Sequence, residues 1–211
     1  MKILNLYAGI GGNRKLWGEK HEITAVEYND DIAAVYKEFY PNDTVIVGDA
    51  HEYLLKHYKE FDFIWASPPC QSHSRILDSQ YTRDNYNPKY PDMKLWQEII
   101  FLQGHARKNR WVVENVIPYY TPLIKPTVEL ARHLFWSNFN IPKIEFKDDT
   151  IIKSVKGSDG LYGVTLDNYY LPNKRQILRN MVNPEVGKYI LDRAIEKDIL
   201  LDGVQGSLFN V

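Results

Sequence analysis

Cysteine is almost absent from this sequence, since Cys70 is the only one among 211 residues. A single cysteine excludes a disulfide within the chain and a zinc site built from several thiolates, and we expect no metal ion. No apolar run is long enough to span a bilayer, and the start of the chain, Met1 to Leu4, lacks the layout of a signal peptide. We therefore expect a protein of the reducing cytoplasm with no membrane partner.

A large net charge is also missing, because the formal value is -1. The charges are nevertheless unevenly placed: residues 19–62 hold 4 Lys and Arg against 11 Asp and Glu, whereas residues 63–180 hold 16 against 11. The half that contains Cys70 is thus the more basic one, which permits a face that contacts phosphates without proving one. Since 44% of the residues are hydrophobic, the chain can bury one sizeable core.

Short β-branched or aromatic runs alternate with longer amphipathic stretches along the chain. The runs predict strands at residues 3–7, 23–27, 44–47, 61–66 and 111–113, and the stretches predict helices at about 12–20, 30–40, 51–58, 92–108 and 184–197. This order predicts an α/β fold with a doubly wound, parallel sheet. Residues 72–91 and 142–179 interrupt the alternation, the first as a long loop and the second as a small insert.

The candidate nucleophile is Cys70, which the rigid turn Pro68-Pro69 places just beyond the strand predicted at 61–66. In open α/β sheets, ligands bind beyond the carboxyl ends of the strands. Glu114 ends the next predicted strand, and pairing of the two strands would bring its carboxyl beside the thiol. A thiolate and a carboxylic acid together suit conjugate addition to an electron-poor ring. The alternatives are a buried, inert cysteine and a glutamate that only caps a helix or ends a strand.

A glycine-rich turn from Tyr7 to Gly12 follows the first predicted strand and is typical of nucleotide or nucleoside cofactor sites. Glu27 ends the second strand, where a carboxylate binds a ribose diol, and Tyr28 beside it suits packing on adenine. Asp49, after the third strand, is placed to accept a hydrogen bond from the adenine amino group. In the alternative interpretation, Glu27 and Asp49 only cap the helices that follow.

Arg132 lies in the apolar run from Ala131 to Trp136, which has the character of a strand. An unpaired guanidinium group is costly to bury in such surroundings. We therefore expect Arg132 to meet an anion there.

The ordered set of these motifs resembles the DNA cytosine-5 methyltransferase family through nearly the whole chain. The matching motifs are Tyr7-Ala8-Gly9-Ile10-Gly11-Gly12, Val26-Glu27-Tyr28, Gly48-Asp49, Pro68-Pro69-Cys70-Gln71, Glu114-Asn115-Val116, Arg132 and Asn180-Met181-Val182. The resemblance implies a Rossmann-like methyltransferase fold that binds S-adenosylmethionine. The cofactor contacts it implies are Tyr7, Ala8, Gly9, Ile10, Gly12, Glu27, Tyr28, Asp49, Ala50 and Pro69, with Asn180 closing the pocket.

The same resemblance implies a DNA (cytosine-5-)-methyltransferase whose catalytic residues are Cys70, Glu114 and Arg132. The substrate would be a cytosine flipped out of double-stranded DNA. Cys70 would attack its C6 atom, Glu114 would contact N3 and the amino group, and Arg132 would steady the adduct. Residues 72–91 are expected to close over the flipped base.

The resemblance divides the chain into four parts: a catalytic domain at 1–142, a short target-recognition insert at 143–179, a returning C-terminal helix at 180–199 and a tail at 200–211. The insert is much shorter than the recognition domain that the family usually has. Its candidates for contact with phosphates and bases, which also suit an ordinary solvated surface, are Lys153, Lys156, Tyr162, Tyr169, Tyr170, Lys174 and Arg175.

Two positions depart from the family's pattern: Asn5 stands where an aspartate is usual, and Leu134 replaces the second arginine of an Arg-x-Arg pair. Two other functions stay open. The short insert also suits an RNA cytosine-5 methyltransferase, because folded RNA is recognised largely by shape. A noncatalytic subunit of a larger DNA-binding assembly is the second, although the presence of Cys70, Glu114 and Arg132 argues against it.

The last residues contain a run, Gln205-Gly206-Ser207-Leu208-Phe209, that resembles the motif by which bacterial proteins dock on the replication sliding clamp. In that interpretation, Gln205 is the polar anchor and Leu208 and Phe209 form the apolar plug. The alternative is local packing of the tail on the protein's own surface. A clamp already threaded on DNA would raise the local concentration of substrate for a protein with a short recognition insert.

Overall fold

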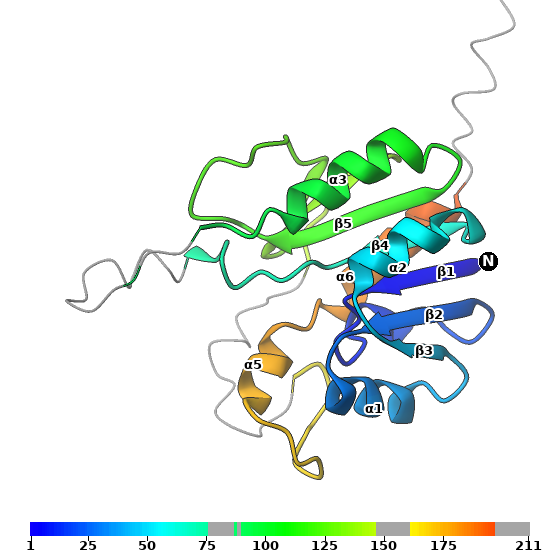
Figure 1. Ribbon diagram of the computed structural model, residues 1–211, viewed down its shortest axis with the longest axis vertical. Coiled ribbons are helices and arrows are strands. Elements are labelled where there is room, and N and C mark those ends of the chain that lie inside the picture. Colours follow the sequence, from blue (N-terminus) through cyan, green and yellow to red (C-terminus); the bar gives the residue numbers. More distant parts are fainter. Residues whose placement is uncertain (76–86, 88–89, 147–160, 197–211) are drawn as a thin grey trace, which may run out of the picture.

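A computed structural model describes residues 1–75, 87, 90–146 and 161–196 of the chain. This part contains a seven-stranded sheet with the order β3-β2-β1-β4-β5-β7-β6 (Figure 1). The strands are β1 Lys2–Leu6, β2 Glu22–Glu27, β3 Thr44–Val47, β4 Phe63–Ala66, β5 Arg110–Val116, β6 Val128–Leu130 and β7 His133–Ser137. Strands β1 to β5 pair in parallel, whereas β7 is antiparallel to both β5 and β6. The predicted α/β fold is thus confirmed, with an antiparallel hairpin at one edge.

Helices cover both faces of this sheet. They are α1 Asp30–Phe39, α2 Ala50–His57, α3 Lys94–His105, α5 Lys174–Arg179 and α6 Pro184–Ile195, with the 3-10 turns η1 Asn13–Leu16 and η2 Tyr58–Glu60. On one face, α2 and α3 share a core with Leu4 of β1, and on the other face α6 shares a core with Ile3. Neighbouring residues of β1 are therefore buried on opposite sides, which explains why the parallel strands are continuous apolar runs.

The helix predicted at 12–20 is wrong, because only the short turn η1 forms there. Gly18 takes a left-handed conformation with φ of +75°, which ends the helical path. Trp17 is buried against α6 and donates from Nε1 to the carbonyl oxygen of Gly187 at 3.1 Å. The contact of Trp17 with α6 thus replaces the further helical turns that were predicted after η1. The other predicted strands and helices are confirmed to within a few residues.

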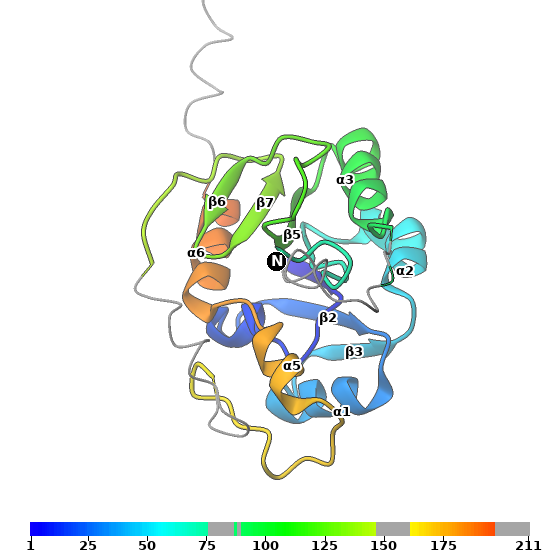
Figure 2. The same cartoon turned by 90° about the vertical axis from the view of Figure 1, so that its left-hand side faces the viewer.

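Residues 161–179 of the predicted insert pack against the glycine-rich turn and α1. Leu161 and Leu178 share a buried cluster with Ile10 of the glycine-rich turn and with Val35 of α1. Figure 2 accordingly shows α5 beside α1. Lys15 Nζ donates to the carbonyl oxygen of Tyr162 at 2.6 Å. This stretch is therefore anchored on the glycine-rich turn, α1 and Lys15 of η1.

The residues proposed for nucleic-acid contact in the insert differ in their surroundings. The Tyr169 hydroxyl donates to Glu38 Oε1 at 2.7 Å, and its ring packs edge-on against Phe39. Tyr169 thus has a structural role, whereas Tyr170 is fully exposed. Lys153 and Lys156 lie outside the described residues, as do the tail motif 205–209 and most of the loop 72–91.

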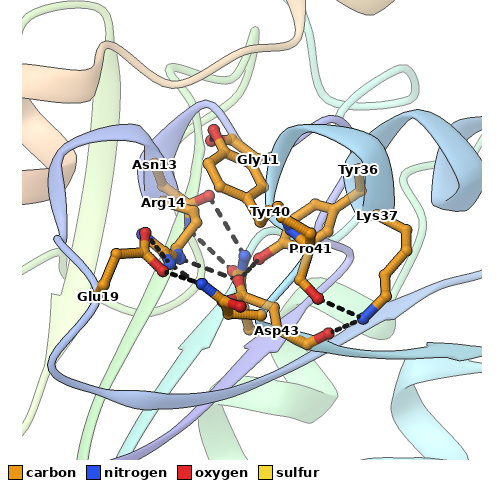
Figure 3. A network of polar contacts seen from close by, with 11 residues as sticks. Gly11, Asn13, Arg14, Glu19, Tyr36, Lys37, Tyr40, Pro41 and Asp43 are labelled. Atoms are coloured by element: carbon orange, nitrogen blue, oxygen red, sulfur yellow. Dashed lines mark hydrogen bonds and ion pairs between the residues drawn. The ribbon is translucent and has the colours of Figure 1, made fainter.

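A buried polar network joins η1 to the residue that precedes β3 (Figure 3). Arg14 donates to the Asp43 carboxylate from Nε at 2.9 Å and from Nη2 at 3.0 Å, and both side chains are 2% exposed. The Tyr36 hydroxyl donates to Asp43 Oδ2 at 2.8 Å. The Arg14 guanidinium also lies over the ring of Tyr40, whose hydroxyl donates to the Gly11 carbonyl oxygen at 2.8 Å. Through Tyr40, the network thus holds the glycine-rich turn in place.

No helix in the described ranges is both long enough and apolar enough to cross a membrane.

Candidate active site

Cys70 lies just beyond β4, in a turn that the neighbouring strand holds in place. The Asn115 side chain on β5 donates from Nδ2 to the Pro68 carbonyl oxygen at 2.9 Å. On the other side, the backbone N–H groups of His73 and Ser74 donate to the carbonyl oxygen of Cys70 at 3.0 and 3.1 Å. Cys70 as a residue is half-buried. A fixed backbone that leaves the residue partly accessible is an arrangement that suits a nucleophile.

Glu114 is brought to the same place by the pairing of β4 with β5, as its sequence position predicts. Ala66, the last residue of β4, pairs with Val113, so that Glu114 is level with the turn that leads to Cys70. The Glu114 side chain is 8% exposed, and its Oε1 atom lies 3.4 Å from Nε2 of His133. A carboxyl so deeply buried is poorly stabilised in its ionised form.

The thiol and the carboxyl perturb each other electrostatically. Burial raises the pKa of Cys70 to about 11, and the negative charge of Glu114 adds to this effect, while Arg132 opposes it. Burial likewise raises the pKa of Glu114 to about 7, against the hydrogen bond from Ser67 and the charge of Arg132. Near neutral pH, Cys70 is therefore a protonated thiol, and a large fraction of Glu114 is a carboxylic acid that can donate a proton.

Arg132 is near both groups, but its position differs from the prediction. It lies in the turn between β6 and β7 and not in a strand. Its Nη2 atom donates to the carbonyl oxygens of Arg179 at 2.5 Å and Met181 at 3.0 Å, and not to an anion. The Nε atom has no hydrogen-bond partner within the part of the chain that the structure describes. Arg132 thus ties the hairpin to the segment before α6.

The glycine-rich turn is held by the carboxylate of Glu27. Glu27 Oε2 accepts a hydrogen bond from the Gly9 N–H at 2.9 Å, and Oε1 accepts one from the Asn29 N–H at 3.0 Å. Asn29, and not Glu27, caps α1 through its bond with Ile32 N. The alternative of a simple helix cap is thus wrong for Glu27. Its role in binding a ribose stays a prediction.

Asp49 does cap a helix, as the alternative interpretation holds. Its Oδ1 atom accepts from Glu52 N at 3.1 Å at the start of α2, and this bond is the main reason why the pKa of Asp49 is lowered. Oδ2 lies 3.3 Å from Lys94 Nζ on α3. The cap leaves open whether Asp49 also contacts a bound nucleoside. Ala50, the next residue, is buried as the first residue of α2.

The other predicted cofactor residues differ in their exposure. Tyr28 is 78% exposed at the end of β2, and Pro69 is exposed in the turn before Cys70. Ala8 and Ile10 are buried and support the turn from beneath. Asn180, which is exposed, caps the end of α5.

The segment after Asn180 touches the glycine-rich turn directly. A Cβ atom on Gly12 would lie 2.8 Å from the Val182 carbonyl oxygen, so that only glycine permits this approach. In contrast, a Cβ on Gly9 or Gly48 would meet no atom within 4 Å. Open space thus lies beside the turn and beside Asp49. This arrangement fits S-adenosylmethionine, for which Glu27 offers a carboxylate and Tyr28 an exposed ring.

Two features of the site were missed by sequence reasoning. The first is His133, which is buried beside Glu114. The second is a cluster under the cofactor turn, in which the Tyr7 hydroxyl donates to Glu98 Oε1 and His51 Nδ1 lies 3.3 Å from the same oxygen. Glu98 is fully buried on the apolar face of α3. An acid on the apolar face of this predicted helix was the signal in the sequence that could have indicated the cluster.

Asn5, which replaces the usual aspartate, is fully buried and pairs with Asn13 at the start of η1. Asn13 Nδ2 donates to Asn5 Oδ1 at 2.8 Å, and Asn5 Nδ2 lies 3.5 Å from Asn13 Oδ1. Two neutral amides thus satisfy each other in the interior. A buried carboxylate at position 5 would need a charged partner instead.

The strand order, the glycine-rich turn after β1 and the acids after β2 and β3 define a Rossmann-like methyltransferase fold. The family model of C-5 cytosine-specific DNA methylases matches residues 1–117. The chain therefore belongs to the C-5 cytosine-specific DNA methylase family, and the resemblance seen in its motifs is confirmed.

Individual relatives and solved structures match different shares of the chain. A tRNA (cytosine(38)-C(5))-methyltransferase of Spodoptera frugiperda is 33% identical over 90 residues, which cover 40% of this chain and 26% of that protein. The chain thus spans about a quarter of that relative's length. A crystal structure of Spodoptera frugiperda DNMT2 has a TM-score of 0.45 at 22% identity, over 70% of this chain and 53% of the other. A SAM-dependent methyltransferase from Agrobacterium tumefaciens has a TM-score of 0.37 at 14% identity, over 57% and 40%.

Proposed function

We propose that the protein transfers a methyl group from S-adenosylmethionine to C5 of cytosine in double-stranded DNA, through a covalent adduct with Cys70. The main support is the proximity of half-buried Cys70, in the turn after β4, to the buried carboxyl of Glu114 in the neighbouring strand β5. The family of the chain points to the same chemistry.

In this mechanism, Cys70 loses its thiol proton to solvent as the flipped base enters, and the charge of Arg132 favours the thiolate. The sulfur bonds to C6 while Glu114 gives its proton to N3, so that electron density moves to C5. Bound S-adenosylmethionine supplies the electrophilic methyl group that C5 takes. N3 then returns its proton to Glu114. C5 gives its own proton to solvent, the electron pair left on C5 forms the C5=C6 double bond, and the C6–S bond breaks to free Cys70 as a thiolate, which regains a proton from solvent.

Trapping with 5-fluorocytosine tests the nucleophile, because fluorine at C5 blocks the elimination that frees the enzyme. The wild-type protein with cofactor and a 5-fluorocytosine duplex should form a complex that survives denaturing electrophoresis. Cys70→Ala should form none. Equal trapping by Cys70→Ala, or wild-type trapping that does not depend on cofactor, would refute the assignment.

RNA is the second candidate substrate, since the relative named above is a tRNA methyltransferase. Labelled cofactor incubated in parallel with duplex DNA and with folded tRNA, followed by mass spectrometry of nucleosides, separates the two. We expect 5-methyl-deoxycytidine from the DNA. Methylcytidine from tRNA alone would transfer the proposal to RNA, and no product from either would favour the noncatalytic subunit.

We further propose that the run Gln205 to Phe209 docks on a replication sliding clamp. Fluorescence anisotropy of the peptide 203–211 with a bacterial clamp measures this directly. Binding should be lost in the double variant Leu208→Ala, Phe209→Ala, because the apolar plug would be removed. Absence of binding at tens of micromolar (~10⁻⁵ M, a weak affinity) would reject the contact.

A further inference from the structure

The buried contact between His133 and Glu114 has no part in the mechanism described so far. On the β5–β7 ladder, Glu114 pairs with Phe135 and Val116 pairs with His133. Residues opposite each other in an antiparallel pair point to the same face, so the two side chains are diagonal neighbours. His133 Nε2 lies 3.4 Å from Glu114 Oε1, and the side chains are 6% and 8% exposed.

Other charged or titratable groups surround this pair. Arg132, in the turn before β7, acts electrostatically on both members, and Cys70 in the turn after β4 interacts with Glu114. Burial first, and the charge of Arg132 second, lower the pKa of His133 to about 3. The imidazole is therefore neutral at ordinary pH and can serve as a hydrogen-bond partner, whereas a cation next to Arg132 is disfavoured.

We propose that His133 is a positioning residue that orients the Glu114 carboxyl and donates a hydrogen bond from Nε2 to it when Glu114 has given up its proton. This role rests on the proposed function of Glu114 as the acid that protonates cytosine N3. Proton transfer leaves a buried carboxylate whose other donor is the Ser67 hydroxyl, and each donor that such a carboxylate lacks is expensive. A contact of 3.4 Å in the free protein is one that can tighten as substrate binds.

The test is a pH titration of the Glu114 carboxyl in the free protein, by infrared difference spectroscopy with Glu114→Gln as the blank. His133→Leu removes the donor and should raise the midpoint by at least about one pH unit, a tenfold change in the ionisation constant. His133→Gln keeps an N–H donor at a similar reach and should shift the midpoint by less than half as much. Where the leucine variant does not fold, His133→Met replaces it.

His51→Leu is the matched control, because His51 contacts a different buried glutamate, Glu98, at 3.3 Å. It should leave the Glu114 midpoint unchanged. Equal midpoints in wild type and His133→Leu would overturn the proposal, and so would equal shifts in the leucine and glutamine variants. Since the titration needs neither substrate nor cofactor, a failed trapping experiment would count against the methyl transfer and not against the contact.

Discussion

Two buried polar clusters, one around Asp43 and one around Glu114, differ in how completely their charges are matched. Asp43 precedes β3 and accepts three hydrogen bonds, two from Arg14 and one from Tyr36. Glu114 lies in the second half of β5, where its contact with His133 is 3.4 Å long. The first cluster holds opposite charges together at the amino end of a strand. The second holds a buried acid whose negative charge is poorly compensated. This acid lies near the carboxyl end of its strand, where α/β proteins bind ligands.

This difference has a physical consequence. A paired buried charge mainly supports the fold, because removing one partner leaves the other unpaired in the interior. A poorly paired buried acid has a raised pKa and can exchange a proton near neutral pH. The cluster that supports the fold and the cluster whose acid can exchange a proton thus lie in separate parts of the molecule.

The largest effect is expected from breaking the matched cluster. Asp43→Asn leaves the buried Arg14 guanidinium with only the exposed carboxylate of Glu19 as an ionic partner, and it should lower the free energy of unfolding by about 3–5 kcal/mol, measured by urea denaturation. The exposed pair of Lys188 and Asp192 on α6 provides the control. Asp192→Asn should change stability by less than about 0.5 kcal/mol. Equal losses of stability in both variants would show that the buried pair of Arg14 and Asp43 supports the fold no more than an exposed ion pair does.

The next effect concerns the thiol beside the unmatched cluster. With a pKa raised to about 11, Cys70 should react with iodoacetamide at pH 8 about 100-fold more slowly than a thiol of pKa 9, since only the thiolate reacts. The same chain unfolded in denaturant supplies the reference, because it has no other cysteine. Glu114→Gln should speed the reaction by removing a nearby negative charge. A reaction midpoint near pH 9 in the folded protein would contradict the prediction.

Glu114→Gln itself should cost about 2–3 kcal/mol of transition-state stabilisation, measured as kcat/KM, with nearly unchanged cofactor affinity. A collapse of cofactor affinity would instead indicate a structural role.

The same variant should alter how stability depends on pH. The folded-state pKa of Glu114 is raised from 4.5 to about 7, so the native state binds this proton more tightly than the unfolded state. Stability should therefore fall as pH rises from about 4.5 to 7 and stay lower above it. Glu114→Gln lacks this contribution, and comparing denaturation of both proteins at pH 5 and pH 8 measures it.

The smallest effects are expected on the cofactor side. Glu27→Ala and Asp49→Ala should each weaken S-adenosylmethionine binding by about 1–3 kcal/mol in calorimetry, through loss of charge-assisted hydrogen bonds. Asp49→Ser separates two roles, because serine preserves the helix cap without the charge. Full affinity in the serine variant would show that Asp49 acts through α2 alone, and full affinity in Glu27→Ala would reject the pocket.

The sequence by itself determined the fold class and the meeting of Cys70 with Glu114. Apolar periodicity is a local property of the chain, and it located five strands to within a few residues. Because parallel strands have their carboxyl ends at one edge, residues that end β1 to β5 had to converge there. The turn at Tyr7 to Gly12, Glu27 and Asp49 follow from the same rule.

Only the tertiary structure decided which side chains form ion pairs and hydrogen bonds with one another. Arg14 meets Asp43, Tyr7 meets Glu98, and the Arg132 guanidinium meets carbonyl oxygens near Asn180 instead of an anion. The partners lie 29 to 91 residues apart in the chain. His133 reaches Glu114 because the antiparallel register of β5 and β7 makes them diagonal neighbours, and a shift by one residue would turn His133 to the opposite face. Register and long-range contacts depend on how whole elements pack, which local patterns of residues do not specify.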